Sequence, residues 1–184
     1  VTTEVPTAGE GDGGPTTEEL LTAAISGASA RTVSLIRAGS EIPTIGVYLP
    51  VSKALVTVST DLPGHLVVRF SDGSEIPADR IGQDGNLMVY GFAPDTVLPA
   101  APSTKLTPSS DVKQGQTVIG LDGQGGAVTG IVSRVDAVGI YANLPGIENG
   151  AAVVNLSGAI IGIAGGGGLF LPAERIDALV PPVQ

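Results

Sequence analysis

The stretch AAVVNLSGAIIGIAG, residues 151–165, decides the fold, because it holds two short apolar runs separated by Ser157 and Gly158. Short runs rich in Val and Ile that end at Gly, Ser, Asp or Pro are typical of β-strands. From Arg31 onward the chain repeats this pattern at intervals of roughly ten residues, which is the spacing of a β-sandwich or a β-barrel. The sequence therefore predicts an all-β protein.

The β-type runs form two groups on either side of a Pro-rich stretch, APDTVLPAAPSTKLTP, at residues 93–108. Two groups of about six runs predict two β-barrels joined by this connection. The runs are TVSLIR, TIGVYL, ALVTVS, HLVVRF, EIPADRIG and LMVYGF before the connection, and QTVIGL, AVTGIVSRV, GIYANL, AAVVNL, AIIGIAG and GLFLP after it.

Short helices are predicted near both ends of the chain. Thr17 is a suitable N-cap for a helix from Glu18 to about Ser26, with acids in its first turn. A second helix is expected to begin near Pro172, since proline is preorganised for a first helical turn. The predicted organisation is an acidic flexible linker at 1–17, the first helix and first barrel at 18–92, the connection at 93–108, and the second barrel and last helix at 109–184.

Composition excludes several classes of function. The net charge is −9, and only nine Lys and Arg residues are present, so a nucleic-acid partner or an anionic membrane surface is not expected. The chain has no Cys and one His, which excludes a thiolate nucleophile and a multi-His metal site, and we predict no metal and no cofactor. No apolar run approaches the roughly 20 residues of a membrane span. Because the chain begins at Val1, we expect membrane contact only through a segment absent from it.

Several segments, in order, carry a resemblance to a known family. AVTGIVSR (127–134) is close to the pattern T-V-T-x-G-I-V-S, and 151–165 is similar to G-P-L-V-N-x-x-G-x-V-I-G-I-N. ALVTVSTDL (54–62) resembles Y-I-L-T-N-N-H-V-V, and FSDGSEIPADRIGQD (70–84) resembles L-S-D-G-R-E-F-x-A-x-V-V-G-x-D. These patterns belong to trypsin-like serine proteases of the HtrA type. The resemblance runs from about Thr32 to Leu179 and implies a trypsin-like double six-stranded β-barrel.

The resemblance also locates the positions of a catalytic triad, which needs a nucleophilic hydroxyl, an imidazole base and an orienting carboxylate. Thr60 stands where the family has His. Asn86 stands at the position of the orienting Asp when two residues are skipped, and an ungapped match gives Met88. Neither a hydroxyl nor an amide accepts a proton at neutral pH, so the resemblance implies that base and orienting acid are both missing.

The nucleophile motif G-N-S-G-G-P-L-V-N corresponds to IENGAAVVN, which puts Asn149 at the Ser position when the match is anchored on Val154 and Asn155. Anchoring on Pro145-Gly146 gives Glu148 instead. In the first register Ile147 replaces a Gly of the oxyanion loop, and a β-branched residue disfavours the backbone that such a Gly adopts. The resemblance therefore implies a degenerate triad and an altered oxyanion loop.

Three functions follow as hypotheses. The leading one is a pseudoprotease, a catalytically inactive homologue that binds a protein or peptide partner, or serves as a structural module of a larger secreted or membrane-anchored protein. The alternative is a hydrolase with a relocated centre, in which His65 acts on Ser59 or Thr60; no acid in a suitable register is evident beside His65. The third is an inhibitor or a holder of unfolded chains. The family resemblance implies an extracytoplasmic location.

Overall fold

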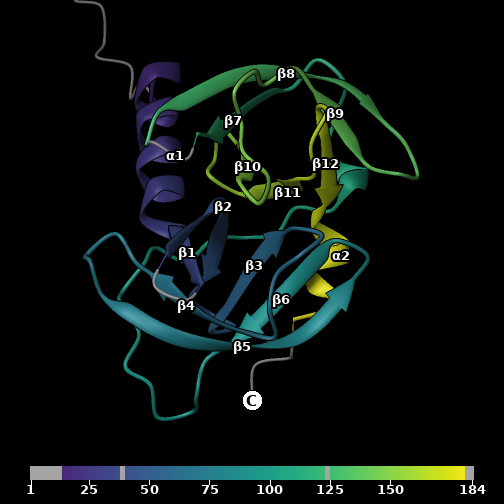
Figure 1. Ribbon diagram of the computed structural model, residues 1–184. Coiled ribbons are helices and arrows are strands. Elements are labelled where there is room, and N and C mark those ends of the chain that lie inside the picture. The colour runs from purple at the N-terminus through teal and green to yellow at the C-terminus, as the bar shows by residue number, and fades with distance from the viewer. Residues whose placement is uncertain (1–13, 38–39, 123–124, 181–184) are drawn as a thin grey trace, which may run out of the picture.

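In the part of the chain that the structure describes, twelve β-strands form two closed antiparallel barrels, one above the other in Figure 1. The computed structural model describes residues 14–37, 40–122 and 125–180, so most of the predicted linker lies outside the described residues. The first barrel, in the order β1-β2-β3-β6-β5-β4, has β1 (Thr32–Arg37), β2 (Ser40–Leu49), β3 (Ala54–Val58), β4 (His65–Arg69), β5 (Glu75–Asp84) and β6 (Leu87–Gly91). The second, in the order β10-β11-β12-β9-β8-β7, has β7 (Thr117–Leu121), β8 (Ala127–Val135), β9 (Ile140–Ala142), β10 (Ala152–Asn155), β11 (Ile160–Ala164) and β12 (Leu169–Pro172).

The strands that face the other barrel are buried on both sides, and this explains their unbroken apolar sequences. All five residues of β3 are buried. Leu55 points into the first barrel, whereas Val56 and Val58 belong to the hydrophobic cluster between the barrels, together with Ile119 of β7. Because successive side chains alternate between the two faces of a strand, both faces of β3 must be apolar. The two barrels therefore share one continuous hydrophobic core, and the loops between them are attached to tightly packed strands.

The first helix, α1 (Thr17–Arg31), begins one residue earlier than predicted. Its N-cap is Thr16, and Thr17 is wrong as the cap. Thr16 Oγ1 accepts a hydrogen bond from the amide of Glu19 (3.2 Å), and Glu19 Oε2 accepts one from the amide of Thr16 (2.7 Å). This reciprocal capping box needs Glu three residues after the cap, and Thr16 meets that condition whereas Thr17 does not.

Helix α1 also ends five residues later than the predicted end at Ser26, although Gly27 is a weak helix former. Ala24, Ala28 and Arg31 are buried on the face that packs against β2, β7 and β10. Tertiary burial extends the helix beyond its local preference. In Figure 1 the helix runs along one side of both barrels.

The connection between the barrels leads through a single 3₁₀ turn, η1 (Ser109–Asp111), into β7. The predicted C-terminal helix is α2 (Ala173–Asp177), and it begins after Pro172 as expected. It lies beside β11 and β12 and reaches the first barrel (Figure 1). Within the described residues no helix is long and apolar enough to traverse a lipid bilayer.

Candidate functional site

Two of the predicted triad positions lie on neighbouring segments of the first barrel. The amide N–H of Ser59, directly after β3, donates to the carbonyl oxygen of Asn86 in the turn between β5 and β6 (2.9 Å). Thr60 is the next residue, and both Thr60 and Asn86 are exposed. Met88, the alternative to Asn86, is 2% exposed and belongs to the core of the first barrel. The structure thus brings Thr60 and Asn86 to the same end of the barrel.

The third predicted position lies on the loop between β9 and β10, which reaches across to the first barrel. The carbonyl oxygen of Asn149 accepts a hydrogen bond from the amide of Ile45 in β2 (3.4 Å). The next residue, Gly150, is buried at φ +87°, and a Cβ there would overlap the carbonyl oxygen of Ile45 and lie 2.7 Å from Thr57 Oγ1. Thr57 donates its hydroxyl to that same carbonyl (2.7 Å). We use the name crevice for the place between the barrels where this loop meets β2 and β3, next to the β5–β6 turn.

Ile147, the residue that replaces the oxyanion-loop glycine, packs its side chain down onto the second barrel. A Cβ on Gly120 of β7 would overlap Ile147 Cδ1, and Ile147 adjoins the core cluster that includes Leu144. The positive φ angles of this loop fall on Gly146 (+79°) and Gly150, as the steric limits on a β-branched residue require. Ile147 is held as a packing residue.

The same loop presents hydrogen-bond donors. Within the described residues, the amide N–H groups of Ile147, Glu148 and Asn149 donate to no protein acceptor, while the carbonyl of Glu148 accepts from Ala151 (3.2 Å). A free amide can donate to a carbonyl or a carboxylate oxygen, although none of these three residues has the positive φ that alternates in an anion-binding nest. The loop can therefore bind an acceptor group without any catalytic side chain.

A recess of about 420 Å³ lies beside this loop. Its lining residues come from β8, β9, the start of the β9–β10 loop and the turn between β11 and β12: Ser133, Tyr141, Ala142, Asn143, Leu144, Pro145, Gly167 and Gly168. The turn between β11 and β12 is built of glycines, with φ of +94°, +63° and +78° at residues 166–168, and a Cβ on Gly166 would lie 3.2 Å from Asn149 Oδ1. The guanidinium of Arg134 lies 3.9 Å from the ring centroid of Tyr141 and so fixes one wall.

The only imidazole is paired with an acid, contrary to the sequence-based expectation. His65 Nδ1 lies 2.8 Å from Asp79 Oδ1, and the side chains are 65% and 78% exposed. The sequence contained the signal: strands on either side of the turn at Asp72 pair residues equally distant from it, and His65 and Asp79 are such a pair. The acid is a neighbour of His65 across the hairpin and not along the chain.

This pair lies away from the proposed nucleophiles. His65 pairs with Asp79 of β5, Asp79 pairs with Gly91 of β6, and Gly91 pairs with Ala54 at the start of β3. His65 therefore lies at the same height in the barrel as the start of β3. Ser59 follows the other end of β3, which is roughly 13 Å farther along at about 3.3 Å per residue. The structure does not bring His65 together with Ser59.

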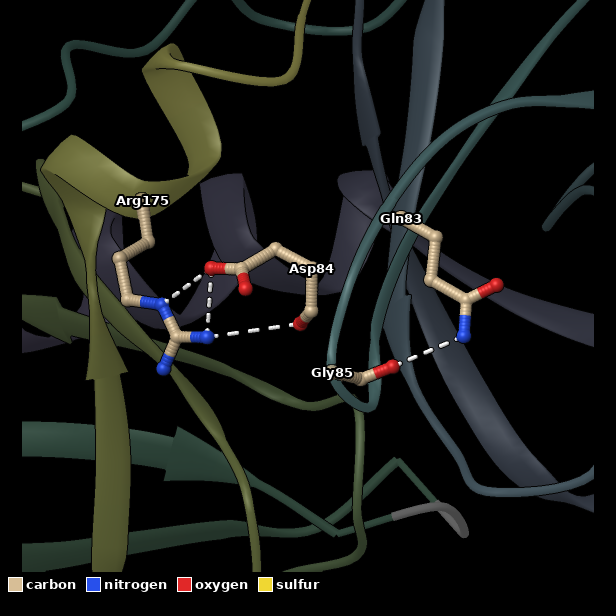
Figure 2. A network of polar contacts seen from close by, with 4 residues as sticks. All are labelled: Gln83, Asp84, Gly85 and Arg175. Carbon is tan, nitrogen blue, oxygen red and sulfur yellow. Dashed lines mark hydrogen bonds and ion pairs between the residues drawn. The ribbon is translucent and has the colours of Figure 1, made fainter.

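Helix α2 fixes the β5–β6 turn that carries Asn86, as Figure 2 shows. Arg175 Nε and one terminal nitrogen donate to Asp84 Oδ2 (2.8 and 2.6 Å), and the same terminal nitrogen approaches the Asp84 carbonyl (3.4 Å). Gln83 Nε2 donates to the carbonyl of Gly85 (2.9 Å) and closes the turn from the other side. The second barrel thereby positions a loop of the first.

On the neighbouring residue of α2, the Glu174 carboxylate accepts hydrogen bonds from the amide of Ser109 (3.0 Å) and from its hydroxyl. Partial burial raises the pKa of Glu174, but these hydrogen bonds outweigh it, and the pKa lies below its usual value. Elsewhere in the described ranges no three His, Asp or Glu side chains gather as metal ligands.

The sequence matches no protein-family model and no curated protein. Among solved structures the chain is similar to the HtrA-type protease AlgW with tripeptide, at 22% identity and a TM-score of 0.66, covering 88% of this chain and 61% of that chain. It is also similar to a serine-to-alanine variant of AlgW with tripeptide, at 21% identity and a TM-score of 0.66, covering 86% of this chain and 61% of that one. The chain thus spans about three fifths of the length of these proteins. Its two closed six-stranded barrels and this likeness identify the trypsin-like fold of the HtrA-type proteases.

Proposed function

We propose that this chain is a trypsin-like domain without peptidase activity that binds a protein or peptide partner at the crevice. The observation that carries the proposal is the identity of the residues at the positions that the family resemblance assigns to the triad: Thr60, Asn86 and Asn149. Acyl transfer needs a base that removes the proton of the nucleophile, and a hydroxyl or an amide cannot do this at neutral pH. Loss of the triad members leaves only the weak catalysis that binding alone provides.

Two features support binding, and neither depends on a catalytic triad: free backbone amides and a recess beside them. The free amides of Ile147, Glu148 and Asn149 can donate hydrogen bonds to a main-chain carbonyl or a carboxylate of a partner. The 420 Å³ recess beside them is of a size that takes one side chain of an extended peptide. Donors that fix the backbone, next to a recess for a side chain, make a peptide-binding arrangement.

Inactivity is tested with a fluorophosphonate probe and with labelled casein. We expect no covalent labelling and no cleavage above a heat-denatured sample, because the one imidazole of the chain, His65, lies at the other end of the first barrel. Probe attachment at Thr60 or at another hydroxyl in the crevice, together with casein cleavage, would refute the proposal.

Binding is tested by fluorescence polarisation with a library of extended peptides. Asn149→Trp fills the crevice at an exposed position, and Val138→Trp, on the 60% exposed residue of the β8–β9 turn, is the matched control. We expect Asn149→Trp to abolish binding of the selected peptides and Val138→Trp to leave it unchanged. Equal binding by both variants would place the partner elsewhere and contradict the proposal.

A second candidate is the hydrolase with a relocated centre, and the His65–Asp79 pair favours it. An acid on Nδ1 holds the imidazole in the tautomer whose Nε2 can act as a base. Its weakness is the exposure of both side chains and the distance to Ser59 along the barrel. If the purified protein hydrolyses p-nitrophenyl esters and His65→Ala removes that activity while Arg69→Ala does not, this candidate replaces the leading one.

The location proposed for the protein is extracytoplasmic, in keeping with the fold of the HtrA-type proteases. The absence of Cys is compatible with any redox compartment, so it does not bear on the location. Fractionation of source cells with an antibody against this domain tests the proposal, and recovery with cytoplasmic markers would contradict it.

A further inference from the structure

A second recess, of about 360 Å³, lies outside the crevice, between the inter-barrel connection and the turn from β10 to β11. We call it the turn recess, and its lining residues are Ser103, Thr104, Lys105, Ser157, Gly158 and Ala159. The connection is held against this turn, because the amide of Ile160 donates to the carbonyl of Lys105 and the amide of Thr107 donates to the carbonyl of Ile160 (2.9 and 2.8 Å). Both walls of the recess are therefore fixed by backbone hydrogen bonds.

A buried arginine lies directly behind the turn recess. Arg31, at the end of α1, is only 3% exposed, and its terminal nitrogens donate to the carbonyls of Pro102 and Gly158 (both 3.4 Å). Its Nε has no hydrogen-bond partner among the described residues. Burial lowers the pKa of this guanidinium from a very high normal value. The guanidinium therefore places a positive charge behind the Gly158 carbonyl, without lining the recess itself.

The charges around the turn recess differ from those of the rest of the chain. Asp and Glu outnumber Lys and Arg by 18 to 9, yet none of the residues that line the recess is acidic. Among the described residues neither Arg31 nor Lys105 forms an ion pair, whereas Arg37, Arg134 and Arg175 each do. Lys105 lines the recess and Arg31 lies behind its Gly158 wall, while Thr104 and Lys105 also line a neighbouring hollow together with Glu174 and Asp177.

The walls also carry free hydrogen-bond donors, beside carbonyls of Ser103, Thr104 and Ser157 that accept from no described protein donor. Within the described part of the chain, the amides of Ser103, Thr104 and Lys105 and the hydroxyl of Ser103 donate to no protein acceptor. The other two hydroxyls are engaged, since Thr104 Oγ1 donates to the Gly158 carbonyl (2.9 Å) and Ser157 Oγ to Asn155 Oδ1 (2.7 Å). A phosphate group accepts several hydrogen bonds at once and carries close to two negative charges at neutral pH.

We propose that the turn recess binds a phosphate group, with Lys105 and the amides of 103–105 as direct donors and the Arg31 guanidinium as a buried positive charge behind Gly158. This site is independent of the crevice and of the proposed function. Arg31 acts through the Gly158 carbonyl and orders the wall of the recess, so it is a positioning residue. Lys105 is exposed and is the residue whose replacement tests the site.

The test titrates the whole chain with inorganic phosphate at constant ionic strength and follows amide chemical shifts by NMR. We expect saturable shifts at 103–105 and 157–159. Lys105→Glu should weaken binding by at least about tenfold, the equivalent of one charge-assisted hydrogen bond. Lys113→Glu makes the same charge change at another exposed lysine and should leave binding within about twofold, since screening weakens distant charges.

A second arm uses O-phosphoserine amide in place of inorganic phosphate, and acetate serves as a control for a singly charged carboxylate. Tighter binding of inorganic phosphate identifies a free ion as the source, and tighter binding of the phosphoserine derivative identifies a phosphorylated chain. Either result supports the proposal if Lys105→Glu weakens it. The proposal is overturned if neither phosphate compound gives saturable shifts at the turn recess, if acetate binds equally well, or if Lys105→Glu and Lys113→Glu behave alike.

Discussion

Replacing Gly150 by Ala should cost far more stability than the same replacement at Gly146, although both glycines lie in one loop at positive φ. Gly146 has φ +79° and no atom within 4 Å of the position of a Cβ. Gly150 has φ +87°, and its Cβ would overlap the carbonyl oxygen of Ile45, which is backbone of a buried strand and cannot move aside. The pair therefore separates the cost of the backbone conformation from the cost of the collision.

The magnitudes follow from these two contributions. A non-glycine residue in the left-handed region costs about 1–2 kcal/mol, and we expect this cost alone for Gly146→Ala. Overpacking adds about 1–3 kcal/mol, so Gly150→Ala should lose roughly 2–5 kcal/mol. For a chain of this size each kcal/mol lowers Tm by about 2–4 °C, and the two variants should melt several degrees apart.

The assay is equilibrium urea unfolding followed by far-UV circular dichroism, with the midpoint and slope fitted for each variant. An unchanged slope shows that the midpoint reports stability. If the two variants lose the same free energy to within about 0.5 kcal/mol, the β9–β10 loop does not press against the first barrel, and the reasoning about the crevice fails.

Three smaller effects should also be measurable. Thr57→Val should lose about 1–2 kcal/mol in urea unfolding, because it removes the hydroxyl from a fully buried hydrogen bond; a loss below 0.3 kcal/mol would contradict this. A double-mutant cycle of Arg175→Met with Asp84→Asn should give a coupling of only about 0.5 kcal/mol that falls with salt, since both side chains are partly exposed; a coupling unaffected by salt would be evidence against a screened pair. Because the pKa of Glu174 is lowered in the folded state, this carboxylate stabilises the fold at pH values above its unfolded pKa of 4.5, and the contribution is lost as the pH falls through the folded pKa. Ser109→Ala removes the hydroxyl donor, so the unfolding free energy of this variant should fall less steeply with decreasing pH. An unchanged pH dependence would show that the hydrogen bonds do not perturb the carboxyl.

The strands and the last helix could be predicted from the sequence because each depends on residues that are close together along the chain. Each β-run was recognisable because its apolar residues end at a turn residue, and the twelve strands lie where the twelve runs were expected. The helix after Pro172 was recognisable for the same reason. The triad positions stay predictions that rest on the family resemblance, since the structure places Thr60, Asn86 and Asn149 without testing what they do.

Contacts between distant segments could not be predicted in the same way. The length of α1 depends on the burial of Ala28 and Arg31 against the barrels, which overrides the low helix propensity of Gly27. The pairing of His65 with Asp79 depends on the register between β4 and β5, which the turn at Asp72 sets. The residues next to His65 along the chain do not indicate it.

The sequence by itself determined the number and order of strands, because strand and turn preferences act over a few neighbouring residues. Only the tertiary structure decided which residues meet in the crevice, because Ile45 and Thr57 belong to the first barrel and Gly150 to the second. They come into contact only when the two barrels pack together. The residues next to Gly150 in the sequence do not specify which distant backbone packs against it. The need for glycine at position 150 follows only from the packing of the two barrels.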